Sequence, residues 1–273
     1  MPIIAITREM GSLGKDVAAG LGQVLNLPIV YHEVADRLAD RMRVRKSHVI
    51  RLLDGTAGLL QRLTADKTSL AIFSAEEIYD LALQESGAVI RGWGATQLLR
   101  EIPHAICVRV CAPLELRKRR MMERLNTDDD ATVSMEIHCN DQAHMAVIQR
   151  NFGVHWADSE NYDVAFNTER ISVDECIEEV IRLVKSDAFA ETEQSRQHLE
   201  DRALAARVRA ALRLSPLTRD AKLSVVASRG QVTLAGKIAT ETLLALAEVV
   251  PGVAGVKDFD YHSMGLEATS RPN

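Results

Sequence analysis

The sequence predicts a parallel α/β sheet with helices on both faces, followed by a small α+β domain. Short continuous apolar runs alternate with helical patterns through residues 1–186, which is typical of strands buried on both faces. Residues 187–198 are polar and lose apolar periodicity, so we expect a linker there. Residues 199–262 have the pattern helix, strand, strand, helix, strand, and we expect residues 263–273 to form a flexible tail.

Five apolar segments predict the strands of the large sheet. They cover residues 3–6, 27–31, 88–94, 104–110 and 161–168. Helical periodicity predicts helices over residues 17–25, 34–53, 95–101, 114–124, 133–152 and 173–184, with further helices before residue 83. In the small domain we expect helices at 199–212 and 239–250 and strands at 222–227, 231–235 and 253–261.

The composition is ordinary for a globular chain: 273 residues, of which 47% are hydrophobic and 26% charged, with a net charge of −5. This balance disfavours non-specific nucleic-acid binding. No apolar run approaches the length of a membrane span, and the first ten residues do not resemble a signal sequence. The four cysteines show no C-x-x-C spacing, so we expect neither a zinc knuckle nor a disulfide framework. These features predict a cytoplasmic protein.

A glycine-containing turn joins the first strand to the first helix in the segment Glu9-Met10-Gly11-Ser12-Leu13-Gly14-Lys15-Asp16. Such a turn aims backbone N–H groups and a helix N-terminus at an anion. Gly14 and Lys15 fit the phosphate-binding pattern G-x-x-x-x-G-K-[ST], whereas Glu9 replaces its first glycine. Asp16 replaces the hydroxyl that binds Mg²⁺. A phosphate cradle and an ordinary β–α turn that needs glycine both remain open.

Three segments are expected at one rim of the sheet, because ligands of parallel sheets bind beyond the carboxyl ends of the strands. They are residues 11–15, 32–33 and 91–94. After the fourth strand, Arg117, Arg120 and Arg124 share one helix face. This face is either a solvated charged surface or a set of guanidinium groups for phosphates. The following helix carries Asp141, His144 and Arg150, and the two helices together predict a lid.

The first 186 residues resemble the cytidylate kinase-like family of P-loop proteins, which are relatives of the nucleoside monophosphate kinases. The motifs that carry the resemblance are Ile6 to Lys15 (ITREMGSLGK), Arg91-Gly92-Trp93-Gly94-Ala95, Ala112-Pro113-Leu114-Glu115-Leu116-Arg117 and Asn161-Tyr162-Asp163-Val164-Ala165-Phe166-Asn167-Thr168. Residues 199–262 resemble a BON domain, an αββαβ module, through the segments at 230–236 (GQVTLAG) and 250–256 (VPGVAGV).

The first resemblance implies transfer of the γ-phosphoryl group of ATP, with Mg²⁺, to a nucleoside monophosphate such as CMP or dCMP. It implies that the donor phosphates and their metal are held by Gly11, Ser12, Gly14, Lys15 and Asp16, of which Asp16 is the expected Mg²⁺ ligand. The expected catalytic residues are Lys15, Arg117 and Arg120. The expected residues that bind the acceptor substrate are His32, Arg91, Trp93, Asp141, Arg150 and Asp163.

Three departures from the family pattern bear on this expectation. Asp16 adds negative charge near the phosphates, Trp93 stands where cytidylate kinases carry an arginine, and His144 stands near a common lid arginine. The alternative is a nucleotide-binding regulatory protein with weak or no turnover that signals through its BON-like domain. A kinase of a non-nucleotide acceptor is a further possibility. For the BON-like domain we expect oligomerisation or a protein partner ahead of contact with phospholipid.

Overall fold

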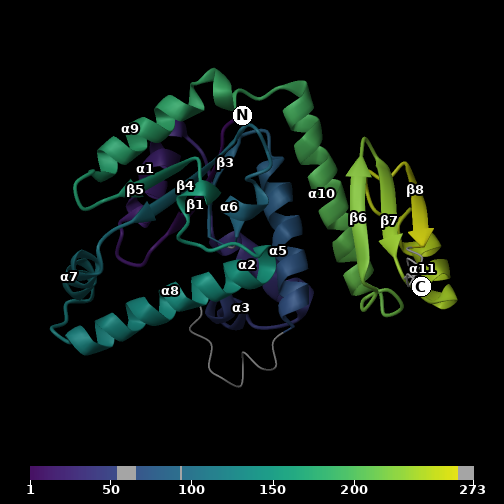
Figure 1. Cartoon of the computed structure of the whole chain (residues 1–273), viewed down its shortest axis with the longest axis horizontal. Coiled ribbons are helices and arrows are strands. Elements are labelled where there is room, and N and C mark those ends of the chain that lie inside the picture. Colours follow the sequence, from purple (N-terminus) through teal and green to yellow (C-terminus); the bar gives the residue numbers. More distant parts are fainter. Residues whose placement is uncertain (54–65, 93, 264–273) are drawn as a thin grey trace, which may run out of the picture. The chain divides into compact units, whose positions relative to one another are not determined.

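The computed structural model describes residues 1–53, 66–92 and 94–263 and divides the chain into two compact units, Met1–Ser195 and Arg196–Asn273 (Figure 1). The predictions for Trp93 and for the tail from residue 264 onward lie outside the described residues.

The first unit contains a five-stranded parallel sheet in the order β2-β3-β1-β4-β5. The strands are β1 (Ile3–Arg8), β2 (Ile29–Val30), β3 (Ala88–Arg91), β4 (Ala105–Cys111) and β5 (Val164–Asn167). β1 lies at the centre, with Ile6 paired to Arg91 of β3 on one side and to Val108 of β4 on the other. The predicted parallel α/β sheet is confirmed, and its central strand leads directly into the glycine turn.

Helices cover both faces of this sheet. On one face, α1 (Gly14–Leu25) and α9 (Val173–Val184) bury Leu21 and Val180 against Ile4 and Ile6 of β1. Ser172 begins α9 with a capping box formed with Glu175. The other helices before β4 are α2 (His32–Met42), α3 (Lys46–Leu53), α5 (Lys67–Ala82) and α6 (Ala95–Leu98).

The single helix expected at residues 34–53 is wrong, because the chain breaks it at Arg43. Arg43 adopts φ 54°, ψ 42°, and its N–H donates to the carbonyls of the preceding turn. The N–H of Val44 then bonds to Ala39 O at 3.0 Å, which completes a Schellman-type end. Non-glycine residues rarely take this conformation, so the sequence carries no glycine signal for the break.

Two long helices form a hairpin between β4 and β5. They are α7 (Leu114–Leu125) and α8 (Asp130–Phe152), and Asp129 caps α8 by accepting from Thr132 N–H. Met121 of α7 packs with Val133 and Ile137 of α8, and Met10 of the glycine turn joins this small core. The α7–α8 hairpin occupies the segment predicted to form a lid, and one of its apolar contacts is with the loop that a lid would cover. The lid role itself stays a prediction.

The second unit is built on α10 (Glu193–Leu214), β6 (Leu223–Ser228), β7 (Gln231–Gly236), α11 (Thr240–Val249) and β8 (Asp258–Ser263). β7 is the middle strand, antiparallel to β6 and parallel to β8. Arg229 and Gly230 turn the hairpin with φ of 50° and 90°, the positive values a tight turn requires. Leu204, Val208, Val232 and Leu246 form its core. The αββαβ order is confirmed.

Two boundaries differ from the sequence expectation. Residues 187–198 contain the short helix η2 (Asp187–Phe189) and the start of α10, so this segment is more ordered than a polar linker. The last strand begins at Asp258 rather than at 253, after turns at Val253 and Val256. Across the described ranges, no helix is long and apolar enough to span a membrane.

Candidate functional site

The glycine turn after β1 is shaped by close packing as well as by backbone conformation. Gly11 has φ 82°, and a Cβ atom there would lie 2.7 Å from the carbonyl oxygen of Arg117. A Cβ atom on Gly14 would lie 2.6 Å from Cβ of Arg8. Leu13 also adopts a positive φ of 64° and is the residue before α1. The turn therefore presents the N-terminus of α1 at the carboxyl end of the central strand, the arrangement of an anion site.

Ser12 is fully buried and its hydroxyl is used within the protein. Its Oγ atom donates to Glu9 O at 2.8 Å and lies 3.0 Å from Val110 O, while its N–H donates to Glu9 O at 3.2 Å. Ser12 therefore fixes the turn to β4, and its expected contact with donor phosphates stays a prediction.

Lys15 and Asp16 lie exposed on the first turn of α1. A carboxylate is the kind of ligand that Mg²⁺ prefers, and Mg²⁺ usually keeps several waters and substrate phosphate oxygens around one or two carboxylates. Within the described ranges, no three His, Cys, Asp or Glu side chains form a metal-binding group. Asp16 thus fits a metal that is held largely by the nucleotide and not one held by the protein alone.

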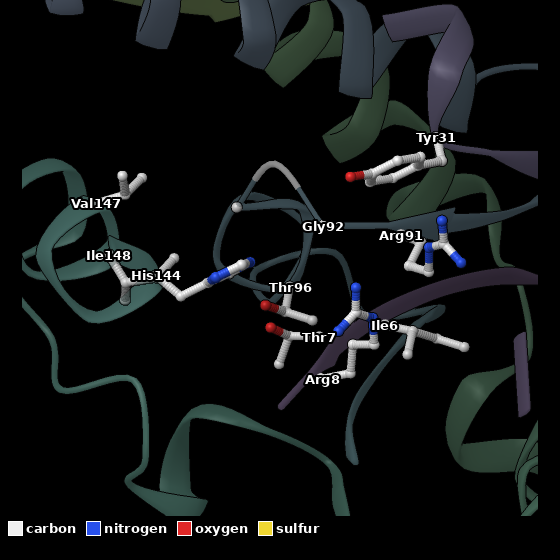
Figure 2. Close-up of a pocket in the computed structure, with 11 residues that line it drawn as sticks. Ile6, Thr7, Arg8, Tyr31, Arg91, Gly92, Thr96, His144, Val147 and Ile148 are labelled. Atoms are coloured by element: carbon white, nitrogen blue, oxygen red, sulfur yellow. The ribbon is translucent and has the colours of Figure 1, made fainter. Parts of the chain in front are cut away.

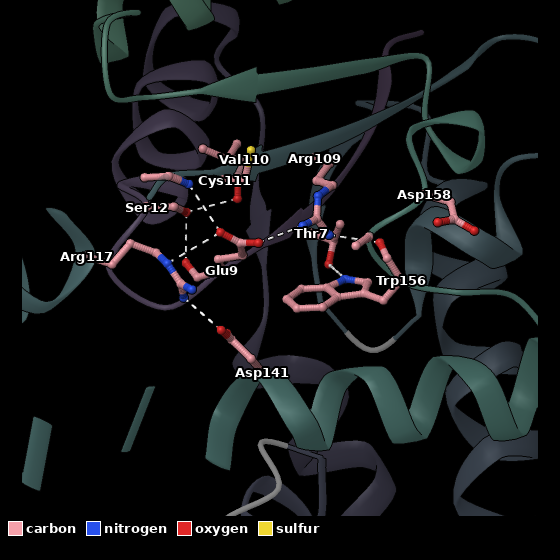
Figure 3. A network of polar contacts seen from close by, with 12 residues as sticks. Thr7, Glu9, Ser12, Arg109, Val110, Cys111, Arg117, Asp141, Trp156 and Asp158 are labelled. Carbon is pink, nitrogen blue, oxygen red and sulfur yellow. Dashed lines mark hydrogen bonds and ion pairs between the residues drawn. The ribbon is translucent and has the colours of Figure 1, made fainter. Parts of the chain in front are cut away.

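Glu9 stands where the phosphate-binding pattern has its first glycine, and its carboxylate joins three segments (Figure 3). Oε1 accepts from Nη2 of Arg109 at 2.7 Å. Oε2 accepts from the N–H of Ala112 at 3.2 Å and lies 3.4 Å from Nε of Arg117. The glutamate that departs from the pattern therefore links the turn to β4 and α7 through its carboxylate.

Arg109 is a buried arginine that the sequence analysis did not single out as a site residue. Its Nη1 donates to Trp156 O at 2.8 Å, and its guanidinium lies 4.8 Å from the Trp156 ring. The indole N–H of Trp156 donates to Oγ1 of Thr7 at 2.9 Å, and His144 stacks on the indole with ring centroids 5.3 Å apart. The signal was available: Arg109 is a charged residue inside the apolar run of a buried strand.

The two arginines expected to be catalytic lie against the glycine turn. Arg117 is buried, donates from Nη1 to Asp141 Oδ2 at 2.9 Å and contacts Met10 O at 3.3 Å. Arg120 donates to Oγ1 and to O of Thr168 at 3.0 and 2.8 Å. Burial, followed by the neighbouring charge of Arg119, lowers the pKa of Arg120 from its usual value. Both side chains are therefore anchored by protein acceptors.

A pocket lies beside this network, at the carboxyl ends of β1 and β3 (Figure 2). Its charged and aromatic lining includes Arg8, Tyr31, Arg91 and His144, and the guanidinium of Arg91 lies 4.2 Å from the Tyr31 ring. Thr7 and Thr96 add hydroxyls, and α8 closes one side with Val147 and Ile148. The pocket has a volume of about 40 Å³. The structure thus brings Arg91 to the rim with the glycine turn and with a residue of the α7–α8 hairpin.

Two expected site residues lie apart from this constellation. Arg150 is exposed near the end of α8, where its Nε donates to Asn151. Asp163 precedes β5, and its Oδ2 accepts from the N–H of Cys107 at 2.7 Å, near the middle of β4. The contact of both residues with substrate stays a prediction. His32 begins α2 directly after Tyr31, a pocket residue, and its role stays a prediction.

Residues 3–170 match the model of the cytidylate kinase-like family, and residues 200–259 match that of the BON domain. The first match spans more than half of the chain. The chain belongs to the cytidylate kinase-like family. It carries the fold of that family's kinase-like unit together with a BON domain, as its motifs predicted. No curated protein matches the chain.

Solved structures resemble about two thirds of this cytidylate kinase-like chain. An uncharacterized protein from Eubacterium ventriosum has 24% identity and a TM-score of 0.53 and covers 68% of this chain and 99% of its own. Shikimate kinase from Acinetobacter baumannii, in complex with shikimate, has 13% identity and a TM-score of 0.42, with coverages of 70% and 96%. At these identities the first likeness shows the fold alone, and the second adds no argument.

Proposed function

We propose that this protein transfers the γ-phosphoryl group of ATP to a nucleoside monophosphate, with CMP and dCMP as the first acceptors to test. The family match makes a phosphotransferase the leading candidate. The observation that carries the proposal is that Lys15, Arg117 and the pocket of Arg8 and Arg91 all border one glycine turn. Phosphoryl transfer needs little more than positioning and charge neutralisation, which cations on both sides of one turn supply.

On the donor side, the N-terminus of α1 and Lys15 would bind the β- and γ-phosphates. Gly11 and Gly14 would let the backbone approach them. Mg²⁺ would neutralise phosphate charge when bound, and Asp16 is the residue that would hold it. Arg117 and Arg120 border the same turn and would face the transferring group.

On the acceptor side, Arg91 would bind the phosphate of the monophosphate, and Tyr31 and Trp93 would contact its base. A nucleotide needs several hundred Å³, whereas the pocket has about 40 Å³. Acceptor binding therefore requires the lining to move, and we expect α8, which carries His144, Val147 and Ile148, to move outward. This requirement agrees with the lid role of the α7–α8 hairpin.

A coupled assay of ADP formation with Mg²⁺, ATP and a panel of monophosphates tests the proposal. Turnover above the ATPase background with at least one monophosphate is expected. Lys15→Ala is expected to abolish it, and Lys185→Ala, an exposed lysine at the end of α9, is the matched control. Absence of turnover with every monophosphate, together with measurable ATP binding, would exclude the nucleoside monophosphate kinase.

The second candidate is a nucleotide-responsive regulatory protein in which ATP occupancy is signalled through the BON domain. Two observations favour it: Asp16 stands in place of the hydroxyl ligand, and Arg117 and Arg120 are both anchored by protein acceptors. ATP binding without turnover, accompanied by a nucleotide-dependent change in assembly, would support it over the kinase.

For the BON domain we propose self-association or a protein partner, and phospholipid as the less favoured ligand. We also propose a cytoplasmic location, which agrees with four free cysteines. Analytical ultracentrifugation of the full chain with and without nucleotide tests self-association. Sedimentation with anionic vesicles tests the lipid: binding that salt does not weaken would favour lipid over a partner protein.

A further inference from the structure

The glutamate at the first-glycine position has contacts that a simple loop residue would not need. Glu9 is largely shielded, with 16% of its side chain exposed; its two oxygens accept hydrogen bonds from Arg109 and Ala112, and Oε2 lies 3.4 Å from Nε of Arg117. Arg109 is itself held by the carbonyl of Trp156, so the carboxylate is fixed from the sheet side. Glu9 is therefore a rigid anion beneath the first turn of α7.

The guanidinium of Arg117 forms ion pairs with two carboxylates, those of Asp141 and Glu9. Asp141 of α8 holds Nη1 at 2.9 Å, and Glu9 lies 3.4 Å from Nε. Across the described residues, the remaining nitrogen, Nη2, makes no hydrogen bond or ion pair and is not fully buried. Nε is fully buried and makes no hydrogen bond, only the ion pair with Glu9. The guanidinium is planar, so the two hydrogen bonds of Nη1, to Asp141 Oδ2 and Met10 O, together with the charge of Glu9 beside Nε, set the direction of Nη2.

Nη2 belongs to Arg117, whose backbone and side chain both contact the glycine turn. The backbone of Arg117 is so close to Gly11 that a Cβ there would clash, and its Nη1 contacts Met10 O. A donor held in place before the reaction begins is worth more to a transition state than one that must be ordered during it.

We propose that Glu9 is a positioning residue: its carboxylate, with that of Asp141, orients Arg117 so that Nη2 meets the transferring phosphoryl group. The inference rests on the proposed phosphoryl transfer. In this proposal Glu9, which replaces the first glycine, affects the rate of phosphoryl transfer. The alternative is that Glu9 only links the turn to β4 and α7, in which case its loss would affect stability alone. The two readings differ in whether Glu9 acts through Arg117.

A double-mutant cycle on kcat separates them, using the full chain, Glu9→Gln, Arg117→Ala and the double variant. Glu9→Gln keeps the side-chain length and removes the charge. We expect it to lower kcat about tenfold or more, with the KM for ATP changed less than about threefold. In the Arg117→Ala background the same change should cost less than about twofold. Equal losses in both backgrounds, or a loss confined to thermal stability, would overturn the inference.

Glu115→Gln is the matched control, because Glu115 is a carboxylate on the helix of Arg117 that is 82% exposed and, among the residues the structure describes, pairs with Lys118 alone. It should leave kcat unchanged. If Glu9→Gln does not fold, Glu9→Asp, which keeps the charge and withdraws it by one methylene, takes its place in the cycle. It too should lose its effect once Arg117 is absent.

The failure of the proposed function is seen separately, as absence of turnover by the unmodified chain. In that case the same cycle is measured on the affinity for Mg²⁺, ADP and aluminium fluoride, which imitate the transferring group. Coupling between Glu9 and Arg117 in that affinity sustains the inference, and additivity contradicts it.

Discussion

Nη1 of Arg117 lies 2.9 Å from Oδ2 of Asp141, and this ion pair joins the two helices of the α7–α8 hairpin. Only 8% of the arginine side chain and 17% of the aspartate side chain are exposed. The pair sits above the glycine turn, beside the small core of Met121, Ile137 and Met10. Charge pairing and apolar packing therefore close the hairpin on the same loop.

Asp141→Asn should lower the free energy of unfolding by about 1–3 kcal/mol, because it removes the negative charge that balances the buried guanidinium of Arg117. Urea unfolding followed by circular dichroism measures it. Asp130→Asn is the control, since Asp130 pairs with Lys118 on the same hairpin but is 60% exposed. An equal loss from the two variants would contradict the expected importance of burial.

Gly11→Ala should both destabilise the protein and abolish nucleotide binding. Its φ of 82° is unfavourable for alanine, and the added methyl group would press on the carbonyl of Arg117. The strain costs about 1–2 kcal/mol and the overpacking about 1–3 kcal/mol more. Gly153→Ala is matched to it: Gly153 has φ 71° but nothing within 4 Å of an added Cβ, so only the strain remains. Calorimetric titration with ATP and thermal unfolding of both variants make the comparison. Retained ATP affinity in Gly11→Ala would contradict a phosphate-binding role for the turn, and equal losses of stability in the two variants would contradict the close approach of α7 to it.

Trp156→Phe should destabilise the first unit by about 1–3 kcal/mol, because Thr7 Oγ1 would lose the buried indole donor. The aromatic ring beneath Arg109 would be retained, so stacking is not the cause. Thr7→Val removes the acceptor from the other side of the same bond. The double variant should therefore lose less than the sum of the two single losses in urea unfolding, and full additivity would show that the bond contributes nothing.

Local signals were enough to predict most of the fold. The strands predicted at residues 3–6, 88–94 and 104–110 lie within three residues of the bounds of β1, β3 and β4, and helix α9 was predicted residue for residue. These elements combine periodicity with a cap or a turn, so sequence and tertiary context agree. The break at Arg43 was not predictable, because a non-glycine residue there takes a left-handed conformation that the surrounding structure stabilises.

The sequence was enough to predict where the candidate site lies on the sheet, but not which side chains contact one another within it. Order along the chain placed Gly11, Lys15 and Arg91 at one rim, since parallel strands end on the same side. The partners of Glu9 were not predictable, because Arg109 and Arg117 come from segments about a hundred residues away. Spacing along one helix likewise could not show that Arg117 faces Asp141 whereas Arg120 faces Thr168.

Because the thiol of Cys176 is buried, the free energy of unfolding should fall as the pH rises from 8 to 10. Burial, and secondly the charge of Glu175, raises the pKa of Cys176 to about 11. A thiol in the unfolded chain ionises near pH 8.5, so between these values the folded state holds a proton that the unfolded state has lost. Stability is then lost as pH rises, by at most about 1.4 kcal/mol per pH unit for one group.

Cys176→Ala should flatten the pH dependence of the urea midpoint relative to Cys139→Ala, whose thiol is exposed. At pH 8 the native thiol should also resist alkylation, because only about one molecule in a thousand carries the thiolate. Identical slopes in the two variants, or rapid labelling of Cys176 in the folded protein, would show that α9 does not bury this side chain as the structure has it.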